Sequence, residues 1–179
     1  MKKILVFVGE SGSGKTTTIN ELVKRYPDKF KRIITCTSRS ARAGEVDGVD
    51  YHFCPAEYFI DNPDLLPVKK TANGDYYGRR KVDMHSDTHS LLVALRLDAV
   101  KELIDLGFEN IIVVRISITE ELKIKRMQER SDSQEMISSR LQSDVAERVD
   151  IDLGQIPVIN LDATQTLDEK VELIVKACE

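Results

Sequence analysis

The segment Gly9–Thr16, with the sequence GESGSGKT, constrains this chain more than any other feature. It follows the apolar run Ile4–Val8 and precedes Thr17–Arg25, where apolar residues recur at helical spacing. A buried strand, a glycine-rich turn and a helix form the context in which G-x-x-x-x-G-K-[ST] becomes a phosphate-binding loop. Backbone N–H groups of such a turn and the N-terminus of the following helix both favour anions. The chain is therefore predicted to bind a nucleoside triphosphate.

The side chains of this loop have separate expected roles. Lys15 is expected to reach the β- and γ-phosphates, and the Thr16 hydroxyl is expected to hold Mg²⁺. The residues predicted to contact ATP in the loop are Glu10, Ser11, Gly12, Ser13, Gly14, Lys15, Thr16 and Thr17. The alternative is an ordinary glycine turn capped by Ser13, which the Lys-Thr pair directly after a strand disfavours.

Composition indicates an ordinary globular protein. The 179 residues are 41% hydrophobic and 31% charged, and the formal net charge is −4. This balance gives no indication of a general nucleic-acid or membrane surface. The cysteines at 36, 54 and 178 form no C-x-x-C pair, so free thiols are expected. No apolar run is long enough to span a membrane or act as a signal peptide, and a cytoplasmic protein is expected.

Apolar runs alternate with segments of helical spacing along the chain, which predicts an α/β fold with three layers and a mostly parallel five-stranded sheet. Strands are expected at 4–8, 31–37, 90–95, 110–116 and 157–160, and helices at 17–25, 98–106, 120–130, 135–149 and 167–177. Asp98, Thr119 and Thr166 are expected to cap the helices that follow them. We expect a single domain over 1–179, with a core of 1–37, 89–125 and 150–179, an inserted mixed α/β lobe of 38–88 and a helical lid of 126–149.

A second group of residues suits an anionic acceptor. Arg39 and Arg42 are three residues apart, lie among hydroxyl side chains and are followed by Tyr51, so they can converge on one phosphate. A solvated basic loop would otherwise be the commoner interpretation. Beside a phosphate loop, the acceptor site is favoured, because a kinase needs a second substrate held in line.

The predicted helix 120–130 carries a third group. Arg126 and Arg130 are four residues apart, so they face the same way and could neutralise charge on a transferring phosphoryl group. The alternative is a charged, solvent-facing surface that also includes Lys123.

Together, these motifs resemble the guanylate kinase family of nucleoside monophosphate kinases. The pattern T-x-R-x-x-R-x-G-E-x-x-G-x-D-Y runs from Thr37 to Tyr51, and Tyr76-Tyr77-Gly78 follows. The resemblance implies a P-loop kinase fold and ATP-dependent phosphoryl transfer, with Mg²⁺, to a nucleoside monophosphate such as GMP or dGMP. It implies catalytic roles for Lys15, Arg126, Arg130 and Arg140, and places Asn160 near the adenine of ATP. The acceptor-binding residues that we expect are Thr35, Arg39, Arg42, Glu45, Tyr51, Tyr77 and Arg79, with Glu45 also near the metal.

The chain departs from the family where the acceptor base is recognised. The family's glutamate position falls near Val68, with Lys69 and Lys70 beside it, and Arg79 replaces a hydroxyl residue. Two strand-end aspartates of the family read Ala94 and Arg96. Base specificity is therefore expected to be relaxed or changed. Two alternatives stay open: a kinase for another phosphorylated acceptor, such as a phosphorylated sugar, and a non-catalytic binding module, although the intact Lys15-Thr16 pair argues against the latter. The oligomeric state is not predicted.

Overall fold

The computed structural model describes residues 2–42, 44–71, 74–129, 134–135, 137–138, 141 and 153–179. Its larger sheet has the strand order β2-β7-β1-β8-β9, and each neighbouring pair is parallel. The strands are β1 (Ile4–Val8), β2 (Phe30–Arg32), β7 (Ser90–Ala94), β8 (Ile111–Ser117) and β9 (Val158–Asp162). The predicted α/β fold with a parallel five-stranded sheet is confirmed.

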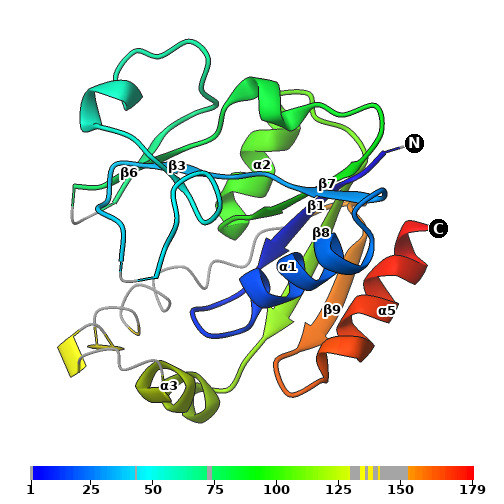
Figure 1. Ribbon diagram of the computed structural model, residues 1–179. Helices are drawn as coiled ribbons and strands as arrows, with labels where there is room; N and C mark the ends of the chain where they lie inside the picture. The colour runs from blue at the N-terminus through cyan, green and yellow to red at the C-terminus, as the bar shows by residue number, and fades with distance from the viewer. Residues whose placement is uncertain are drawn as a thin grey trace.

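Helices cover both faces of this sheet, as Figure 1 shows: α1 (Lys15–Arg25) and α5 (Leu167–Cys178) lie side by side on one face, and α2 (Leu97–Asp105) covers the other. Side chains alternate along β1 and fill both layers. Val6 packs with Val100 and Leu103 of α2. Phe7 packs with Leu22 of α1 and with α5. Each face of the sheet therefore has its own hydrophobic layer, which gives the predicted three layers.

A smaller sheet forms a separate lobe at the upper left of Figure 1, with strand order β4-β3-β6-β5. Its strands are β3 (Cys36–Thr37), β4 (His52–Phe53), β5 (Lys69–Lys70) and β6 (Tyr76–Gly78), and the lobe also contains the 3₁₀ turns η1 (Ala56–Phe59) and η2 (Lys81–Met84). β3 pairs parallel with β4 and antiparallel with β6, which in turn pairs antiparallel with β5.

The prediction of one strand over 31–37 is wrong, because this stretch is divided between the two sheets. The Ile33 N–H still donates to Leu92 of β7 at 2.8 Å. Two residues later, the Thr35 carbonyl accepts from His52 in the small lobe at 2.9 Å. The chain therefore changes sheets around residue 34, and an apolar pattern cannot show that change.

The helix ends match most of the expected caps. Thr166 and Glu169 form a capping box at the start of α5, and Thr119 Oγ1 accepts from Leu122 N at 3.3 Å at the start of α3 (Glu120–Glu129). Asp98 is not a cap: α2 begins at Leu97, directly after the extended residue Arg96, which puts Asp98 inside the first turn. Most of the predicted helix 135–149 lies outside the described residues. Within the described part of the chain, no helix has the length and apolar character needed to cross a membrane.

Candidate active site

The loop after β1 has a backbone that only glycine fits at its first position. Gly9 has φ +148°, and a Cβ added there would lie 2.4 Å from the carbonyl oxygen of Ile116 in β8. Gly14 has φ +100° and precedes α1, which begins at Lys15. The first turn of α1 carries no acidic residue. The positive end of the α1 helix dipole is therefore not offset by an acidic residue within that turn, which favours an anion there.

Lys15 folds back over the loop. Its ammonium group donates to the carbonyls of Gly9 at 2.5 Å and Glu10 at 3.1 Å. Thr16 and Thr17 are exposed on the first turn of α1, whereas Ser13 is fully buried and its Oγ has no hydrogen-bond partner among the described residues. The loop thus holds an ammonium group and exposed hydroxyls at the N-terminus of one helix, which suits phosphate oxygens and Mg²⁺.

A buried ion pair, missed by the sequence interpretation, ties this loop to α3. Lys123 is 1% exposed, and its Nζ lies 2.5 Å from Oε2 of Glu10. The alternative of a solvent-facing surface that includes Lys123 is therefore wrong for this residue. One signal was available, because Lys123 is four residues before Met127, which is also buried and therefore shares its side of the helix. The Glu10 side chain, expected near ATP, is engaged in this pair.

We expect Lys123→Met to lower the stability of the protein by roughly 2–3 kcal/mol, because it removes the Lys123 ammonium group from its ion pair with the partly buried Glu10 carboxylate. The melting temperature should fall by about 4–12 °C for a chain of this size. Thermal unfolding of Lys123→Met, Glu10→Gln and the double variant measures the coupling. Lys125→Met, on the exposed side of the same helix, is the control. Additive losses from the two single variants would contradict a coupled pair.

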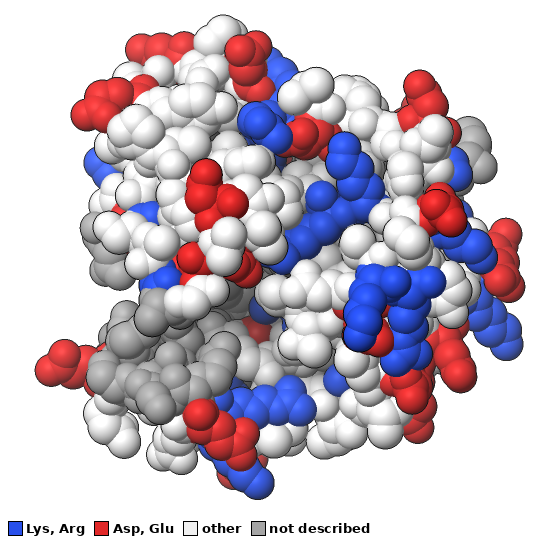
Figure 2. Space-filling model, in the orientation of Figure 1, with Lys and Arg blue, Asp and Glu red and all other residues white. Residues whose placement is uncertain are grey.

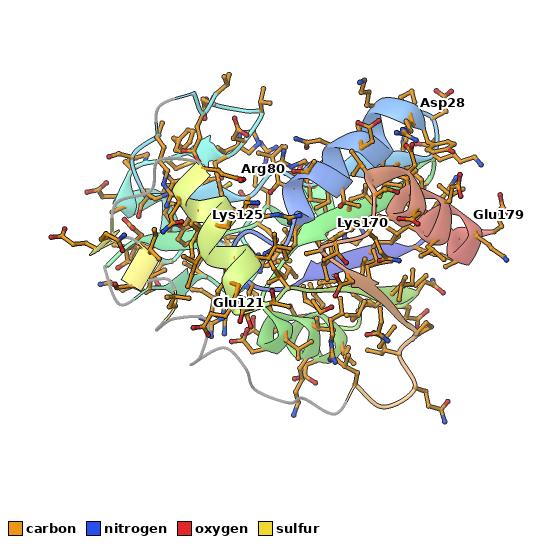
Figure 3. All side chains as sticks on the ribbon, turned by 90° about the horizontal axis from the view of Figure 1, so that it is seen from below. Asp28, Arg80, Glu121, Lys125, Lys170 and Glu179 are labelled. Carbon is orange, nitrogen blue, oxygen red and sulfur yellow. The ribbon has the colours of Figure 1, made fainter. Side chains whose placement is uncertain are left out.

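Arg126 extends from α3 to the phosphate-binding loop. Its Nη1 donates to the Gly12 carbonyl and its Nη2 to the Ala163 carbonyl, both at 2.9 Å. Lys170 of α5, which Figure 3 labels, is buried and donates to the same Ala163 carbonyl at 3.2 Å. Arg126 thus joins the loop to the turn between β9 and α5. Arg130 and Arg140 lie outside the described residues.

The predicted acceptor group forms a connected cluster in the small lobe. The Arg39 guanidinium forms a two-pronged pair with Glu45, with Nη1–Oε2 and Nη2–Oε1 distances of 2.9 Å. It also lies over the rings of Tyr51 and Phe53, at 5.2 and 5.8 Å from their centroids. Tyr77 meets Tyr51 edge-on at 6.2 Å. We call Arg39, Tyr51 and Tyr77 the arginine–tyrosine cluster.

The charges in this cluster are stabilised by its hydrogen bonds. Desolvation alone would lower the pKa of Arg39, but hydrogen bonds to Glu45 and Tyr77 raise it above its usual value. Desolvation alone would raise the pKa of Glu45. The hydrogen bonds from the Arg39 side chain and from the Arg42 backbone nevertheless hold the pKa of this carboxyl below its usual range. The Arg42 N–H donates to Glu45 Oε2 at 2.7 Å, while the Arg42 side chain is exposed. A fixed, fully charged guanidinium therefore faces two tyrosines, which suits a phosphate.

The strand register gives the small sheet two different faces. Cys36 lies opposite Gly78, and Cys36 packs with Phe59 and Leu65 in a hydrophobic cluster. Thr37 lies opposite Tyr77, and Tyr77 lies opposite Lys69, so these residues share the other face. Because side chains alternate along a strand, Thr35 and Arg79 extend that second face at its far end. We call it the polar face.

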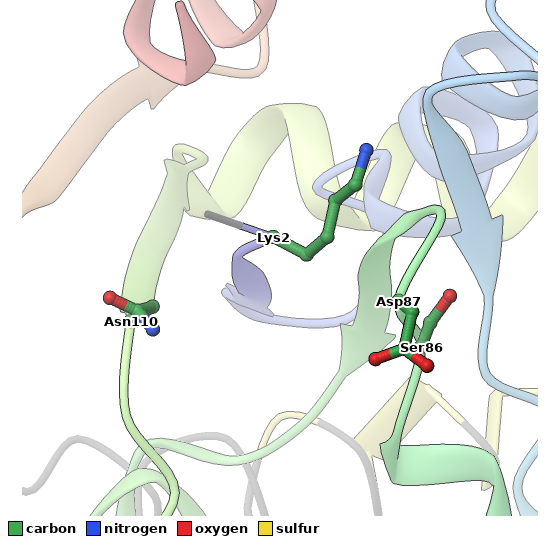
Figure 4. A pocket seen from close by; sticks show the side chains of 4 residues that line it. All are labelled: Lys2, Ser86, Asp87 and Asn110. Atoms are coloured by element: carbon green, nitrogen blue, oxygen red, sulfur yellow. The ribbon is translucent and has the colours of Figure 1, made fainter.

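Charged side chains are unevenly spread over the surface. In the view of Figure 2, Lys and Arg side chains gather across the middle of the molecule, and most Asp and Glu side chains lie nearer the rim. A separate hollow is lined by Lys2, Ser86, Asp87 and Asn110 (Figure 4). These residues precede β1, β7 and β8, so the hollow is at the amino ends of the strands. Ligands of open parallel sheets bind at the carboxyl ends, where the phosphate-binding loop lies.

Comparison with known proteins agrees with this architecture. The profile of the guanylate kinase family matches residues 1–154. The chain belongs to the guanylate kinase family. A guanylate kinase of Mycoplasmoides gallisepticum is 28% identical over 180 residues, which span 97% of this chain and 92% of the relative.

Solved structures share the fold of this guanylate kinase family member. A guanylate kinase from Anaplasma phagocytophilum superimposes with a TM-score of 0.64 and 17% identity, covering 99% of this chain and 84% of that one. A sugar kinase from a Janibacter species gives a TM-score of 0.57 and 17% identity, covering 98% of this chain and 94% of that one. At these identities the superpositions show the fold alone.

The structure brings together some of the site residues suggested by the guanylate kinase resemblance. Arg39, Tyr51 and Tyr77 are in contact, and Thr35 and Arg79 share the polar face with Tyr77. Glu45 is paired with Arg39. Asn160 is exposed on β9, two residues before the strand ends. Val68, which stands near the family's glutamate position, packs in the hydrophobic cluster instead, and Lys69 takes the place on the polar face.

Proposed function

We propose that this protein transfers the γ-phosphoryl group of ATP to a nucleoside monophosphate, GMP or dGMP, with Mg²⁺. The observation that carries the proposal is the pairing of two anion-binding groups on two sheets. The glycine loop with Lys15 follows β1 of the large sheet, and the arginine–tyrosine cluster belongs to the small lobe. A kinase needs both, one for the donor phosphates and one for the acceptor phosphate.

Each group has a part in the transfer. Lys15 leaves the loop carbonyls to bind the β- and γ-phosphates, and the N-terminus of α1 adds its partial positive charge. Arg126 lies against Gly12, close enough to the loop to offset charge on the transferring group. Arg130 and Arg140 join it from the proposed lid, 126–149. Asn160 is assigned to the adenine end of ATP.

The acceptor phosphate is bound by the arginine–tyrosine cluster and by Arg42. Glu45 acts as a positioning residue, because its carboxylate accepts hydrogen bonds from both Nη atoms of Arg39 and from the Arg42 N–H. Thr16 fits a Mg²⁺ ion, since its hydroxyl is an exposed oxygen ligand on the first turn of α1. The ion would supply charge neutralisation between the phosphates. The proposal includes a cytoplasmic location, no nucleic-acid partner and one domain with the core, lobe and lid boundaries given above.

Release of ADP, coupled to an optical readout across all ribo- and deoxynucleoside monophosphates, tests this function. Turnover of GMP or dGMP is the expected result. A phosphorylated pentose belongs in the same panel, because a phosphate-binding cluster alone does not select a nucleotide. Absence of ADP release with every nucleotide, together with turnover of the sugar phosphate, would contradict the proposal. Binding of ATP without turnover of any acceptor would point to a non-catalytic module.

Arg42→Ala tests the assignment of the acceptor phosphate. The variant should lower kcat/KM for the acceptor by about 10- to 100-fold, the effect of losing one charge-assisted contact to a phosphate. ATP binding, measured by calorimetry without acceptor, should stay nearly unchanged. The matched control is Arg25→Ala, an exposed arginine at the end of α1 that pairs with Glu21. If Arg42→Ala lost affinity for ATP to the same extent, Arg42 would belong to the ATP site, and its assignment to the acceptor phosphate would be wrong.

A further inference from the structure

Arg79 is a buried cation that has no ion-pair partner among the described residues. It is only 7% exposed, and its Nε has no hydrogen-bond partner among the described residues. Asp98 and Glu102 of α2 are near enough to act on it electrostatically, but Lys69 forms the ion pairs with them, at 3.6 Å and 2.5 Å. Burial lowers the pKa of Arg79, and the charges of Glu102 and Asp98 offset only part of that effect. A buried guanidinium in this state is costly unless a ligand completes its bonding.

The place of Arg79 points to the ligand that would do so. Arg79 directly follows β6, two residues after Tyr77, so both side chains emerge on the polar face. Alternate residues of a strand are about 7 Å apart. An acceptor whose phosphate is bound at the arginine–tyrosine cluster therefore extends along β6 toward Arg79. The next residue, Arg80, emerges on the opposite face, where its Nε pairs with Asp83 at 2.6 Å.

The chemistry of guanidinium limits what Arg79 can recognise. Its N–H groups only donate, and they lie in a planar fork. Guanine presents two acceptors side by side, O6 and N7, which is the edge that arginine reads with two bonds. Adenine presents N7 beside an amino group, so one prong would meet a donor. Hypoxanthine has the same O6 and N7 as guanine and lacks only the 2-amino group.

The described carboxylates near Arg79 are engaged in ion pairs, and we assign none of them to the 2-amino group of guanine. Val68, near the family's glutamate position, is directed into the hydrophobic cluster, where its Cγ2 would be 3.4 Å from a Cβ on Gly78. Asp98 forms ion pairs with Lys69 and, at 3.4 Å, with Arg96, although its buried Oδ1 accepts no hydrogen bond among the described residues. The polar face therefore offers donors to the 6-oxo edge, while the nearby Asp98 and Glu102 of α2 are ion-paired with lysine and arginine.

We propose that Arg79 is a specificity-determining residue that donates to O6 and N7 of the acceptor base, so that the enzyme selects 6-oxopurine monophosphates as a class. This inference rests on the proposed kinase function. GMP, dGMP and IMP are then acceptors of similar quality, within about tenfold of one another, and AMP is a poor one. The selection depends on the Arg79 guanidinium, at a position where the family resemblance predicts a hydroxyl side chain.

The experiment compares kcat/KM for GMP, IMP and AMP in the wild type, Arg79→Met, Arg79→Lys and the control Arg80→Met. Arg79→Met should lower the GMP and IMP values by about 10- to 100-fold, the discrimination of one two-pronged base contact, and leave AMP unchanged. Its melting temperature should hold or rise, because a buried unpaired charge is removed. Arg79→Lys keeps the charge but loses the fork, so it should also lose GMP selectivity. Arg80→Met should keep the GMP-to-AMP ratio.

The outcomes separate this inference from the proposed function. If wild type phosphorylates GMP but Arg79→Met and Arg79→Lys keep its GMP-to-AMP ratio, Arg79 does not read the base and the kinase function stands. If both variants lose all acceptors equally and melt at lower temperature, Arg79 has a structural role and the inference is overturned. If wild type turns over GMP and rejects IMP by far more than tenfold, the 6-oxopurine class is wrong. If wild type phosphorylates no nucleotide, both proposals fall.

Discussion

Lys15→Met is expected to reduce phosphoryl transfer by about 10³-fold or more, with the fold intact. The Lys15 ammonium group donates to the loop carbonyls of Gly9 and Glu10, next to where the donor phosphates are expected. Removing one preorganised charge from the site of a developing anion commonly costs 10²- to 10³-fold in rate, and this lysine also contributes to ATP binding. Steady-state ADP release with GMP measures the loss.

Two control measurements accompany that experiment. The melting temperature of Lys15→Met should stay within a few degrees of the wild type, because the residue is half-exposed and forms no part of a hydrophobic cluster. Lys24→Met, near the other end of α1, changes the same residue type on the same helix far from the loop and should retain activity. If Lys15→Met kept more than a tenth of the wild-type rate, the assignment of this loop to the catalytic site would be wrong.

Gly9→Ala is expected to destabilise the protein by about 4 kcal/mol. The new Cβ would lie 2.4 Å from the Ile116 carbonyl oxygen of β8, a backbone atom held in the sheet. The residue would also keep a φ of +148°, which side chains rarely adopt. Strain of about 1–3 kcal/mol from the backbone adds to about 1–3 kcal/mol from overpacking. Thermal unfolding should show a melting temperature lower by about 8–16 °C.

Gly107→Ala separates the two contributions. Gly107 has φ +81°, but a Cβ there would meet nothing within 4 Å. This control should therefore lose only the cost of the backbone conformation, about 1 kcal/mol. A melting temperature of Gly9→Ala as high as that of Gly107→Ala would mean that β8 moves aside freely, so that the close contact does not shape the loop.

Local patterns in the sequence correctly predicted several elements of the fold. The loop Gly9–Thr16, the strand Ile4–Val8 before it and the capped helix after Thr166 were all found from neighbouring residues. Their structures follow from short-range physics, namely the glycine dihedral angles, the hydrophobic period and the cap hydrogen bonds. The convergence of Arg39 and Tyr51 was predicted from their residue types and spacing, whereas Tyr77, which is 38 positions after Arg39, was added only through the family resemblance.

Sequence by itself determined the glycine-rich loop after the first strand and the parallel three-layer fold, and it predicted the residues that would bind an acceptor phosphate. Tertiary structure alone decided that Lys123 pairs with Glu10, that residues 30–37 divide between two sheets, and that Lys69 rather than Val68 lies on the polar face. The physical reason is the same in each case. Burial and strand register depend on partners distant in the chain, and a shift of one residue in register turns every side chain to the opposite face.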